Sequence, residues 1–164
     1  MPKFYPLKVK DLYKDTEQCS VIEFDIPEDL KDKFKYKAGQ YLTLRETLNG
    51  EDIRRSYSLC SSPIDDEWKV AVKQIPDGKF STHVNQFLKK DDTLQVMKPM
   101  GRFGTAISEI PKNYIVFTAG SGITPILSMI KTHLAKEPNS TFKLFYLNRT
   151  VKSIIFKEEI EQLR

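Results

Sequence analysis

The sequence changes character near Gly101, and this change constrains the fold more than any other feature. Before it, between about Lys3 and Lys98, short runs of alternating apolar and polar residues are separated by turn signals such as Asn49-Gly50. Alternation with a period of two indicates half-buried strands, and several short strands at this spacing are typical of an antiparallel barrel or sandwich. After Gly101 the pattern becomes strand–helix–strand–helix, which is typical of a doubly wound α/β domain.

The first part is predicted to contain six strands and one helix. The strands are expected at residues 5–12, 20–26, 39–46, 54–61, 68–75 and 93–98. In the first strand the apolar alternation slips before Leu12. The helix is expected at residues 80–88, with Ser81 or Thr82 as its N-cap.

The second part begins with Tyr114-Ile-Val-Phe-Thr118, a continuous apolar run of the kind that forms buried parallel strands. Gly120-x-Gly122-x-x-Pro125 follows and opens a helix that runs to about Ala135. Glycines here let the backbone approach a pyrophosphate, and proline suits the first turn of a helix. A further buried strand is expected at residues 142–147 and a helix at 155–163.

The stretch 54–63, Arg-Arg-Ser-Tyr-Ser-Leu-Cys-Ser-Ser-Pro, combines a cation, an aromatic ring and a hydroxyl. On a strand, Arg55 and Tyr57 share a face and Ser58 follows one step on, because successive side chains point to opposite faces. A flat cofactor that bears phosphates needs a cation to bind the phosphate and an aromatic ring on which to stack. Taken alone, however, the same residues also suit an ordinary strand.

A second candidate lies at the start of the helix near residue 80. The sequence Pro76-Asp77-Gly78-Lys79-Phe80-Ser81-Thr82 leaves a strand through a glycine and enters that helix. A helix N-terminus holds anions through its free N–H groups and partial positive charge, and Lys73 and Lys79 add charge here. The alternative is an ordinary capped surface helix.

The composition limits the partners. The 164 residues carry a net charge of +4, and the lysines are dispersed, which indicates a solvated surface rather than a nucleic-acid stripe. No apolar run suggests a membrane span or a secretion signal. Cys19 and Cys60 are far apart, so reduced thiols in the cytoplasm are expected, and Cys60 is interpreted as structural. His83 and His133 lack a second ligand at metal spacing, so no metal site is predicted.

Taken together, the three motifs resemble the ferredoxin–NADP reductase superfamily, whose members join a flavin-binding barrel to a nicotinamide domain. Arg-x-Tyr-Ser, Gly-x-x-Ser and Gly-x-Gly-x-x-Pro stand in the family's order, and the match covers essentially the whole chain. The chain is most similar to the reductase components of bacterial oxygenases of the phenylacetate-degradation type, through the stretch 54–63 and Asn148-Arg149-Thr150. The resemblance implies residues 1–108 as an FAD-binding barrel and residues 112–164 as an NAD(P)-binding α/β domain.

The resemblance also implies roles for single residues. Tyr57 would stack on the flavin ring and Ser58 would bond near flavin N5, so these two are the expected catalytic residues. The expected FAD-binding residues are Arg55, Tyr57, Ser58, Val72, Lys73, Gly78, Lys79, Phe80, Ser81 and Thr124. The expected NAD(P)-binding residues are Gly120, Ser121, Gly122, Pro125 and Arg149. Arg149 favours NADPH over NADH through the 2′-phosphate, and a surface arginine at a strand end is the equal alternative.

The implied function is a flavin-dependent oxidoreductase that moves electrons from NADPH through FAD to an iron–sulfur centre or carrier serving a multicomponent oxygenase. The chain departs from the family because it stops at Arg164, after two parallel strands. We therefore expect an incomplete, truncated nicotinamide domain, and a chain that binds FAD through its barrel but transfers hydride from NAD(P)H poorly. A [2Fe–2S] centre is expected only if a further C-terminal domain exists.

Three alternatives remain open at the level of sequence. The first is a stand-alone ferredoxin or flavodoxin reductase. The second is a non-catalytic FAD-binding subunit that relays electrons to a partner. The third is a plain nucleotide-binding module without flavin, which predicts a colourless protein. An electron-acceptor protein is the expected partner, with no nucleic acid and no membrane.

Overall fold

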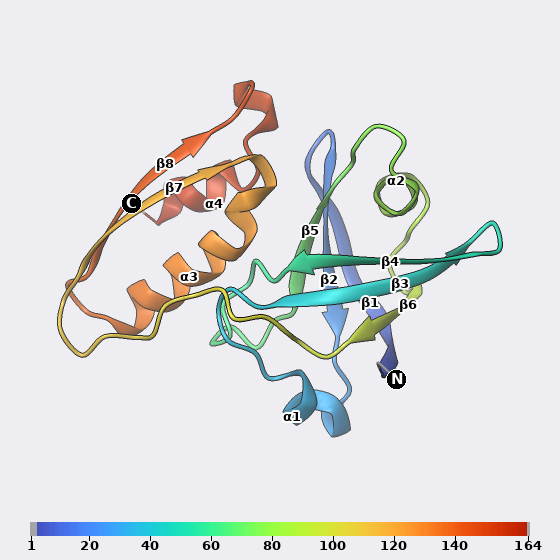
Figure 1. Cartoon of the computed structure of the whole chain (residues 1–164), viewed down its shortest axis with the longest axis horizontal. Helices are drawn as coiled ribbons and strands as arrows, with labels where there is room; N and C mark the ends of the chain where they lie inside the picture. The colour runs from blue at the N-terminus through green and yellow to red at the C-terminus, as the bar shows by residue number, and fades with distance from the viewer. Residues whose placement is uncertain (1–2, 164) are drawn as a thin grey trace.

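A computed structural model describes residues 3–163, so Met1, Pro2 and Arg164 of the expected domain bounds lie outside the described residues. In Figure 1 a β-barrel lies beside a smaller unit of two parallel strands and two helices. The barrel strands are β1 (Phe4–Thr16), β2 (Cys19–Asp25), β3 (Tyr41–Leu48), β4 (Glu51–Ser58), β5 (Lys69–Lys73) and β6 (Thr93–Met97). Their order is β4-β3-β6-β1-β2-β5, and every pairing is antiparallel, which confirms the predicted six-stranded barrel.

The barrel closes through a narrow seam between its two edge strands, β4 and β5. In the described residues, these strands are joined by a single isolated bridge between Leu59 and Val70, with the Cys60 N–H donating to the Lys69 carbonyl at 2.9 Å. The two strands diverge on one side of this bridge. The closure of the barrel is therefore weakest at the strand that carries Arg55 and Tyr57.

Local sequence features explain the register of the strands. The expected slip in the first strand is a β-bulge between Val9 and Asp11, and Leu7 and Val9 before it are fully buried. Asn49 and Gly50 both have positive φ, 51° and 80°, as a tight hairpin between β3 and β4 requires. The alternation and the turn dipeptide thus predicted these features correctly.

The expectation of a single helix in the barrel part was wrong. A short helix, α1 (Lys31–Phe34), follows a 3₁₀ turn, η1 (Glu28–Leu30), before the expected helix α2 (Lys79–Gln86). Phe34 is fully buried, and the Trp68 indole N–H donates to its carbonyl at 2.8 Å, so tertiary contacts hold a segment of only four residues. Four residues are too few for a periodic pattern to reveal.

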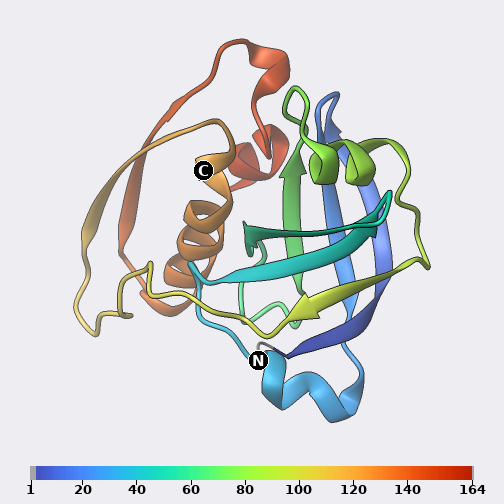
Figure 2. The same ribbon diagram turned by 45° about the vertical axis from the view of Figure 1, so that its right-hand side comes forward.

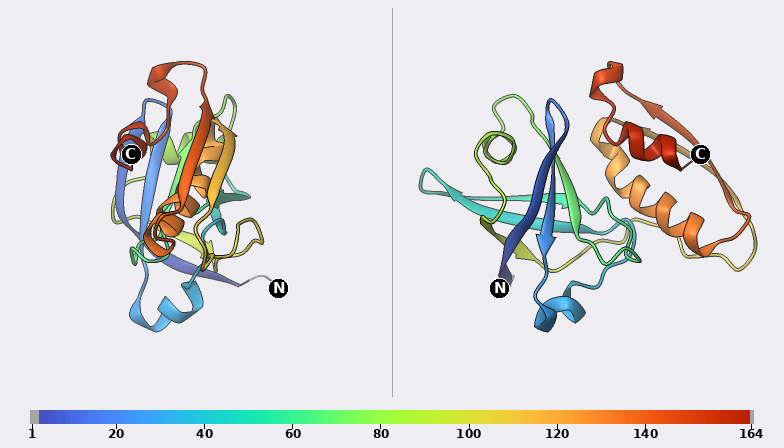
Figure 3. Two further views of the ribbon diagram at one scale, coloured as in Figure 1. Left: turned by 90° about the vertical axis from the view of Figure 1, so that its left-hand side faces the viewer. Right: turned by 180° about the vertical axis from the view of Figure 1, so that it is seen from behind.

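The second unit consists of two parallel strands connected through a helix. Its elements are β7 (Asn113–Ala119), η2 (Gly120–Gly122), α3 (Ile123–Lys136), β8 (Thr141–Leu147), η3 (Val151–Ser153) and α4 (Lys157–Gln162). Figures 1 and 3 place α3 between the parallel strands and the barrel, with β7 and β8 on the outer side. This arrangement is the start of the predicted α/β domain.

One cluster of buried residues joins the barrel to the second unit. It combines barrel residues such as Val21 and Ala71 with Ile123 and Leu127 of α3. The Ser128 hydroxyl donates to the Ser61 carbonyl at 2.6 Å across this interface. The turned view in Figure 2 shows α3 alongside the barrel. The start of α3 is thereby fixed relative to β4 and β5.

The expectation that β7 and β8 are buried strands was wrong for one of their two faces. Ile115 and Phe117 on β7 are 64% and 70% exposed, and Leu147 on β8 is 61% exposed. Side chains at the alternate positions, such as Val116, Leu144 and Tyr146, pack towards α3, whereas no described element covers the opposite face. Continuous apolar runs indicate burial on two faces, and only one of the covering layers is present here. Among residues 3–163, no helix is long and apolar enough to span a membrane.

Candidate functional site

A pocket of about 620 Å³ occupies the place where β4 and β5 diverge. Its walls come from these two strands, from the turn before α2 and from the start of α3. Most of the residues expected to bind FAD therefore meet here. The lining includes Arg55, Tyr57, Ser58, Lys73, Gly78, Lys79, Phe80, Ser81, Ser121 and Thr124.

The cations of this pocket differ in how they are paired. Arg55 donates to the Arg54 carbonyl at 2.7 Å, and no carboxylate among residues 3–163 lies within ion-pair distance of it. Arg54, by contrast, pairs with Asp52 at 2.7 Å, and Lys79 pairs with Glu51. Arg55 is thus the arginine of this strand that is free to bind an anion such as a phosphate.

Tyr57 forms an aromatic platform beside that cation. Its ring is half-buried against the barrel core, and its centroid lies 5.9 Å from that of Phe80 at an interplanar angle of 31°. Burial raises the pKa of the Tyr57 hydroxyl to about 12, although the nearby Arg55 charge opposes this shift. The Tyr57 hydroxyl is therefore protonated near physiological pH, and the packing against Phe80 holds the ring in place.

The N-terminus of α2 provides backbone donors at the same pocket. Gly78, rather than the expected Ser81 or Thr82, is the N-cap, and the helix has no side-chain cap there. The Ser81 hydroxyl is instead engaged, since it accepts from the Ile75 N–H at 3.2 Å and donates to the Gly78 carbonyl at 3.2 Å. The Thr82 N–H donates to the Gly78 carbonyl, so the three preceding N–H groups are left for a ligand.

The space around Gly78 shows why this turn contains a glycine. A Cβ at this position would lie 2.4 Å from Ser81 Oγ and 2.5 Å from Ile75 Cγ1. A side chain at this position would displace Ser81 or Ile75, so the close turn favours glycine. An arginine without a carboxylate partner among residues 3–163, free N–H groups at a helix N-terminus and an aromatic ring suit a cofactor that carries phosphates and a flat ring.

Val72 is the one expected FAD-binding residue that the structure keeps away from this pocket. Its side chain is fully buried in the barrel, and its carbonyl accepts from the Asn85 side-chain amide at 2.9 Å. The Val72 side chain therefore does not line the pocket. Alternation along β5 explains this, because Ala71 and Lys73 on either side of Val72 face the pocket.

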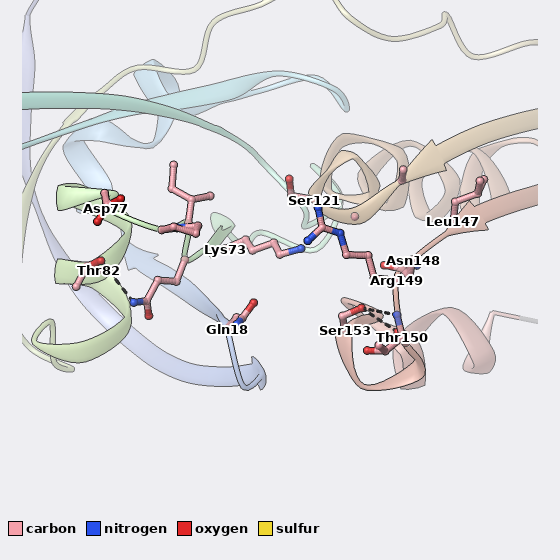
Figure 4. A pocket seen from close by; sticks show the side chains of 15 residues that line it. Gln18, Lys73, Asp77, Thr82, Ser121, Leu147, Asn148, Arg149, Thr150 and Ser153 are labelled. Atoms are coloured by element: carbon pink, nitrogen blue, oxygen red, sulfur yellow. Dashed lines mark hydrogen bonds between the residues drawn. The ribbon is translucent and has the colours of Figure 1, made fainter.

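A second pocket of about 1000 Å³ adjoins the first and lies between the two units. It brings together Gly120, Ser121 and Arg149 of the expected NAD(P)-binding residues with Lys73 of the barrel. In Figure 4 the side chains of Lys73 and Arg149 point towards each other from opposite sides. Asn148 Nδ2, at the same pocket, is buried without a hydrogen-bond partner in the described residues, so the site has an unused donor for a polar ligand.

Gly122 and Pro125 do not line either pocket, although they belong to the same motif. A Cβ on Gly122 would lie 2.7 Å from Thr118 Oγ1, so this glycine permits the tight exit from β7. Pro125 is the third residue of α3, in its first turn, as its type predicted. Both residues therefore shape the turn rather than the pocket walls.

Sequence reasoning missed several polar residues of the two pockets. Glu51 and Asp77 line the first pocket and Gln18 lines the second. Asp77 precedes Gly78 and has a φ of 56°. The Asp-Gly turn dipeptide in the sequence could therefore have indicated that Asp77 lies at this turn. Gln18 lies in the β1–β2 turn, and no local pattern connects it with residues more than a hundred positions away.

Comparison with known proteins gives matches to two protein families. Residues 6–104 match the family described as the oxidoreductase FAD-binding domain. Residues 116–164 match the family described as the oxidoreductase NAD-binding domain. The first match includes the pocket-lining residues of β4, β5 and α2, and the second includes the turn at Gly120.

Several known proteins and solved structures are similar to this chain. One component of the 1,2-phenylacetyl-CoA epoxidase of Escherichia coli is 39% identical over all of this chain and 46% of its own length. The ferredoxin reductase component of the Rhodococcus rhodochrous 3-ketosteroid-9-alpha-monooxygenase is 38% identical over 96% of this chain and 44% of its own. The chain thus spans less than half the length of these relatives.

The solved structures agree with the sequence matches. The structure of a phthalate dioxygenase reductase has a TM-score of 0.78 and 28% identity over 96% of this chain and 47% of its own. A ferredoxin NADP⁺ reductase from Neisseria gonorrhoeae, solved with bound FAD and NADP, has a TM-score of 0.83 over 99% of this chain and 64% of its own. At 22% identity, the second likeness concerns the fold alone.

Proposed function

Because this chain belongs to the ferredoxin–NADP reductase superfamily of FAD-binding and NAD-binding oxidoreductase domains, we propose that it moves electrons from NADPH through FAD to an iron–sulfur centre or carrier serving a multicomponent oxygenase. The observation that carries the proposal is the pocket at the β4–β5 seam. There Arg55 without a carboxylate partner, the Tyr57 ring and the free end of α2 converge.

The residues of this pocket have distinct roles in the proposal. FAD, when bound, supplies the redox chemistry, and the protein supplies position and electrostatics. Arg55 and the N–H groups after Gly78 bind phosphate, and the Tyr57 ring orients the flavin by stacking. The Ser58 hydroxyl lies one residue further along β4 and positions the reactive edge, so we expect it to influence rate more than binding.

The second pocket is proposed to bind the nicotinamide nucleotide. Gly120 and Ser121 form its phosphate turn, and Arg149 together with the Asn148 amide supports NADPH as the preferred donor.

The oxygenase partner is proposed to be of the phenylacetate-degradation type, following the relative that matches over all of this chain. A reducing compartment, the cytoplasm, is proposed because the chain's two cysteines are free and buried.

The proposal is tested by titrating the purified chain with FAD and recording visible absorption. We expect one FAD per chain and a dissociation constant that rises about 10- to 100-fold in Arg55→Ala, because an Arg–phosphate hydrogen bond contributes about 1.5–3 kcal/mol. Arg54→Ala is the matched control on the same strand, since that arginine is already paired with Asp52.

Either of two results would contradict this proposal. One is the absence of flavin binding at any FAD concentration. The other is an equal loss of affinity in Arg54→Ala and Arg55→Ala, because the binding would then depend on overall charge and not on the pocket.

A further inference from the structure

A further hollow lies where the linker between β6 and β7 runs along α3 (Figure 1). Its volume is about 650 Å³, and its walls come from the barrel, the linker and α3. The walls are largely apolar and include Tyr36, Ile64, Trp68, Ala106 and Ile107. None of these five residues lines the two nucleotide pockets described above, so the hollow is separate from both of them.

Three polar side chains form a chain of hydrogen bonds at this hollow. Thr105 Oγ1, in the linker, lies 3.0 Å from His133 Nε2, and both residues line the hollow. His133 Nδ1 lies 2.7 Å from a carboxylate oxygen of Glu137, one turn further along the chain. A hydroxyl, an imidazole and a carboxylate at these separations are the arrangement in which a general base activates a hydroxyl nucleophile.

The imidazole of His133 is fixed in position and shielded from solvent. It is 1% exposed, and the rings of Tyr114 and Phe142 contact it edge-on, with centroid distances of 5.2 and 6.0 Å. Hydrogen bonds lower the pKa of Glu137 to about 2, so this carboxylate only accepts hydrogen bonds. Nδ1 therefore donates to Glu137, and in the neutral ring Nε2 is left to accept the Thr105 proton.

Thr105 is the member of this chain that a reactant can reach. It is exposed, whereas the imidazole behind it is buried. The next two backbone N–H groups, of Ala106 and Ile107, donate to no acceptor among residues 3–163. Such N–H groups next to a nucleophile can bond the oxygen that gains negative charge during acyl transfer. The apolar walls of the hollow suit a small apolar acyl group.

We propose that Thr105 is a nucleophile that takes an acyl group from an activated ester of a small apolar carboxylic acid, with His133 as the general base. Thr105 Oγ1 forms a bond to the ester carbonyl carbon while His133 Nε2 accepts the hydroxyl proton. The bond from this carbon to the leaving alkoxide oxygen then breaks, and His133 returns the proton to that oxygen. The products are an ester on Thr105 and a free alcohol. The inference does not depend on the proposed function.

The test incubates the unchanged chain with p-nitrophenyl acetate and follows the acetylation of each residue by mass spectrometry of its peptides. Thr93, an exposed threonine of β6 without a hydrogen bond to a histidine in the described residues, is the internal control. We expect Thr105 to be acetylated about 100-fold or more faster than Thr93, because a general base contributes about 10²–10⁴-fold. Thr105→Ser should keep the reaction at this position, and Thr93→Val should leave the Thr105 rate unchanged.

His133→Ala separates the chemistry of this residue from its packing. We expect acetylation of Thr105 to fall about 100-fold in this variant, since the general base is lost. Added imidazole should restore part of the rate, because it can occupy the space of the missing ring and accept the proton. Circular dichroism shows whether the variant is folded, and if it is not, the comparison of Thr105 with Thr93 in the unchanged chain decides alone.

Three results would overturn the inference. The first is acetylation confined to lysines, and the second is an equal rate at Thr105 and Thr93. The third is a folded His133→Ala variant whose Thr105 rate is unchanged or does not respond to imidazole. FAD titration of Thr105→Ser separates this test from that of the proposed function, because Thr105 lines neither nucleotide pocket and the variant should bind FAD as the unchanged chain does.

Discussion

At the scale of single residues, Glu137 forms an unusually well-connected buried carboxylate. It is 2% exposed and accepts from the Ser108 N–H at 2.7 Å and the Tyr114 hydroxyl at 2.9 Å. His133 Nδ1 lies 2.7 Å from the same carboxylate, and His133 Nε2 lies 3.0 Å from the Thr105 hydroxyl. These contacts tie the linker, β7 and the end of α3 together, so His133 is a packing histidine.

The Glu137 carboxylate should contribute pH-dependent stability. Burial disfavours its charge, but the Ser108 N–H, the Tyr114 hydroxyl and the other hydrogen bonds outweigh this effect and lower its pKa to about 2. A lowered pKa stabilises the folded state above the unfolded value of 4.5, and this stability is lost as the pH falls from there towards 2.

We therefore expect Glu137→Gln to lower the free energy of unfolding at neutral pH, and the difference from the unchanged chain to shrink on acidification. Urea denaturation across this pH range measures it. Glu109→Gln, at an exposed position of the same linker, is the control. A difference that stays constant with pH would contradict the assignment of this pKa.

How far the sequence reveals the site differs from residue to residue. Strand alternation predicts that Arg55 and Tyr57 share a face, and both line the pocket. Ser58 lines it as well although it is the next residue along the strand, which alternation does not explain. The same rule places Val72 in the core, since Ala71 and Lys73 on either side of it face the pocket. The N-cap of α2 could not be read from residue type, because the Ser81 hydroxyl is engaged by the Ile75 N–H of the preceding turn.

At the scale of elements, the β4–β5 seam is the feature with the clearest dynamic consequence. Within residues 3–163 the strands are joined by one isolated bridge, and the proposed flavin pocket lies where they diverge. Few interstrand hydrogen bonds imply a low free energy of local opening. A ligand that contacts both strands binds only the closed form and therefore stabilises it.

We expect saturating FAD to slow amide hydrogen exchange in β4, β5 and the first turn of α2 by about tenfold or more. Exchange in β1 and β6, which pair on the far side of the barrel, should change much less. The measurement is exchange followed by mass spectrometry of peptides with and without FAD. Uniform protection of all strands would show that FAD stabilises the barrel globally and not through the seam.

The elements that the sequence predicted best are those with a strong local pattern. The slip before Leu12 became a β-bulge, and Asn49-Gly50 became the β3–β4 hairpin turn. α1 was missed because contacts with Trp68, more than thirty residues away, hold it. The burial of β7 and β8 was overestimated because an apolar run does not reveal whether one or both faces are covered.

At the scale of the whole molecule, the outer face of β7 and β8 exposes a group of large apolar side chains, among them Ile115, Phe117 and Leu147. Phe117 and Phe145 stack there with centroids 4.7 Å apart, and both are exposed. Exposed apolar patches bind other apolar molecules or drive self-association. Strands with unpaired edges add to this tendency.

We expect this chain to bind a hydrophobic fluorescent dye such as ANS, and Phe117→Ser/Phe145→Ser to reduce the dye signal by about half or more, because the two rings form the centre of the patch. The melting temperature should change little, since neither ring is buried. Phe4→Ser, which alters a half-buried ring on the barrel, is the control for a general loss of aromatic surface. An unchanged dye signal in the double variant would locate the binding elsewhere.

The position of α3 has a consequence for exchanging domains between related chains. Ser128 bonds to Ser61 of the barrel and Thr132 to Ser62, while other residues of the same helix pack against β7 and β8. A chimera that replaces the nicotinamide half along its domain boundary therefore also replaces one wall of the barrel's packing. These barrel-facing side chains of α3 lie beyond the linker, within the half that is being replaced. We expect a chimera to fold when it nevertheless keeps them.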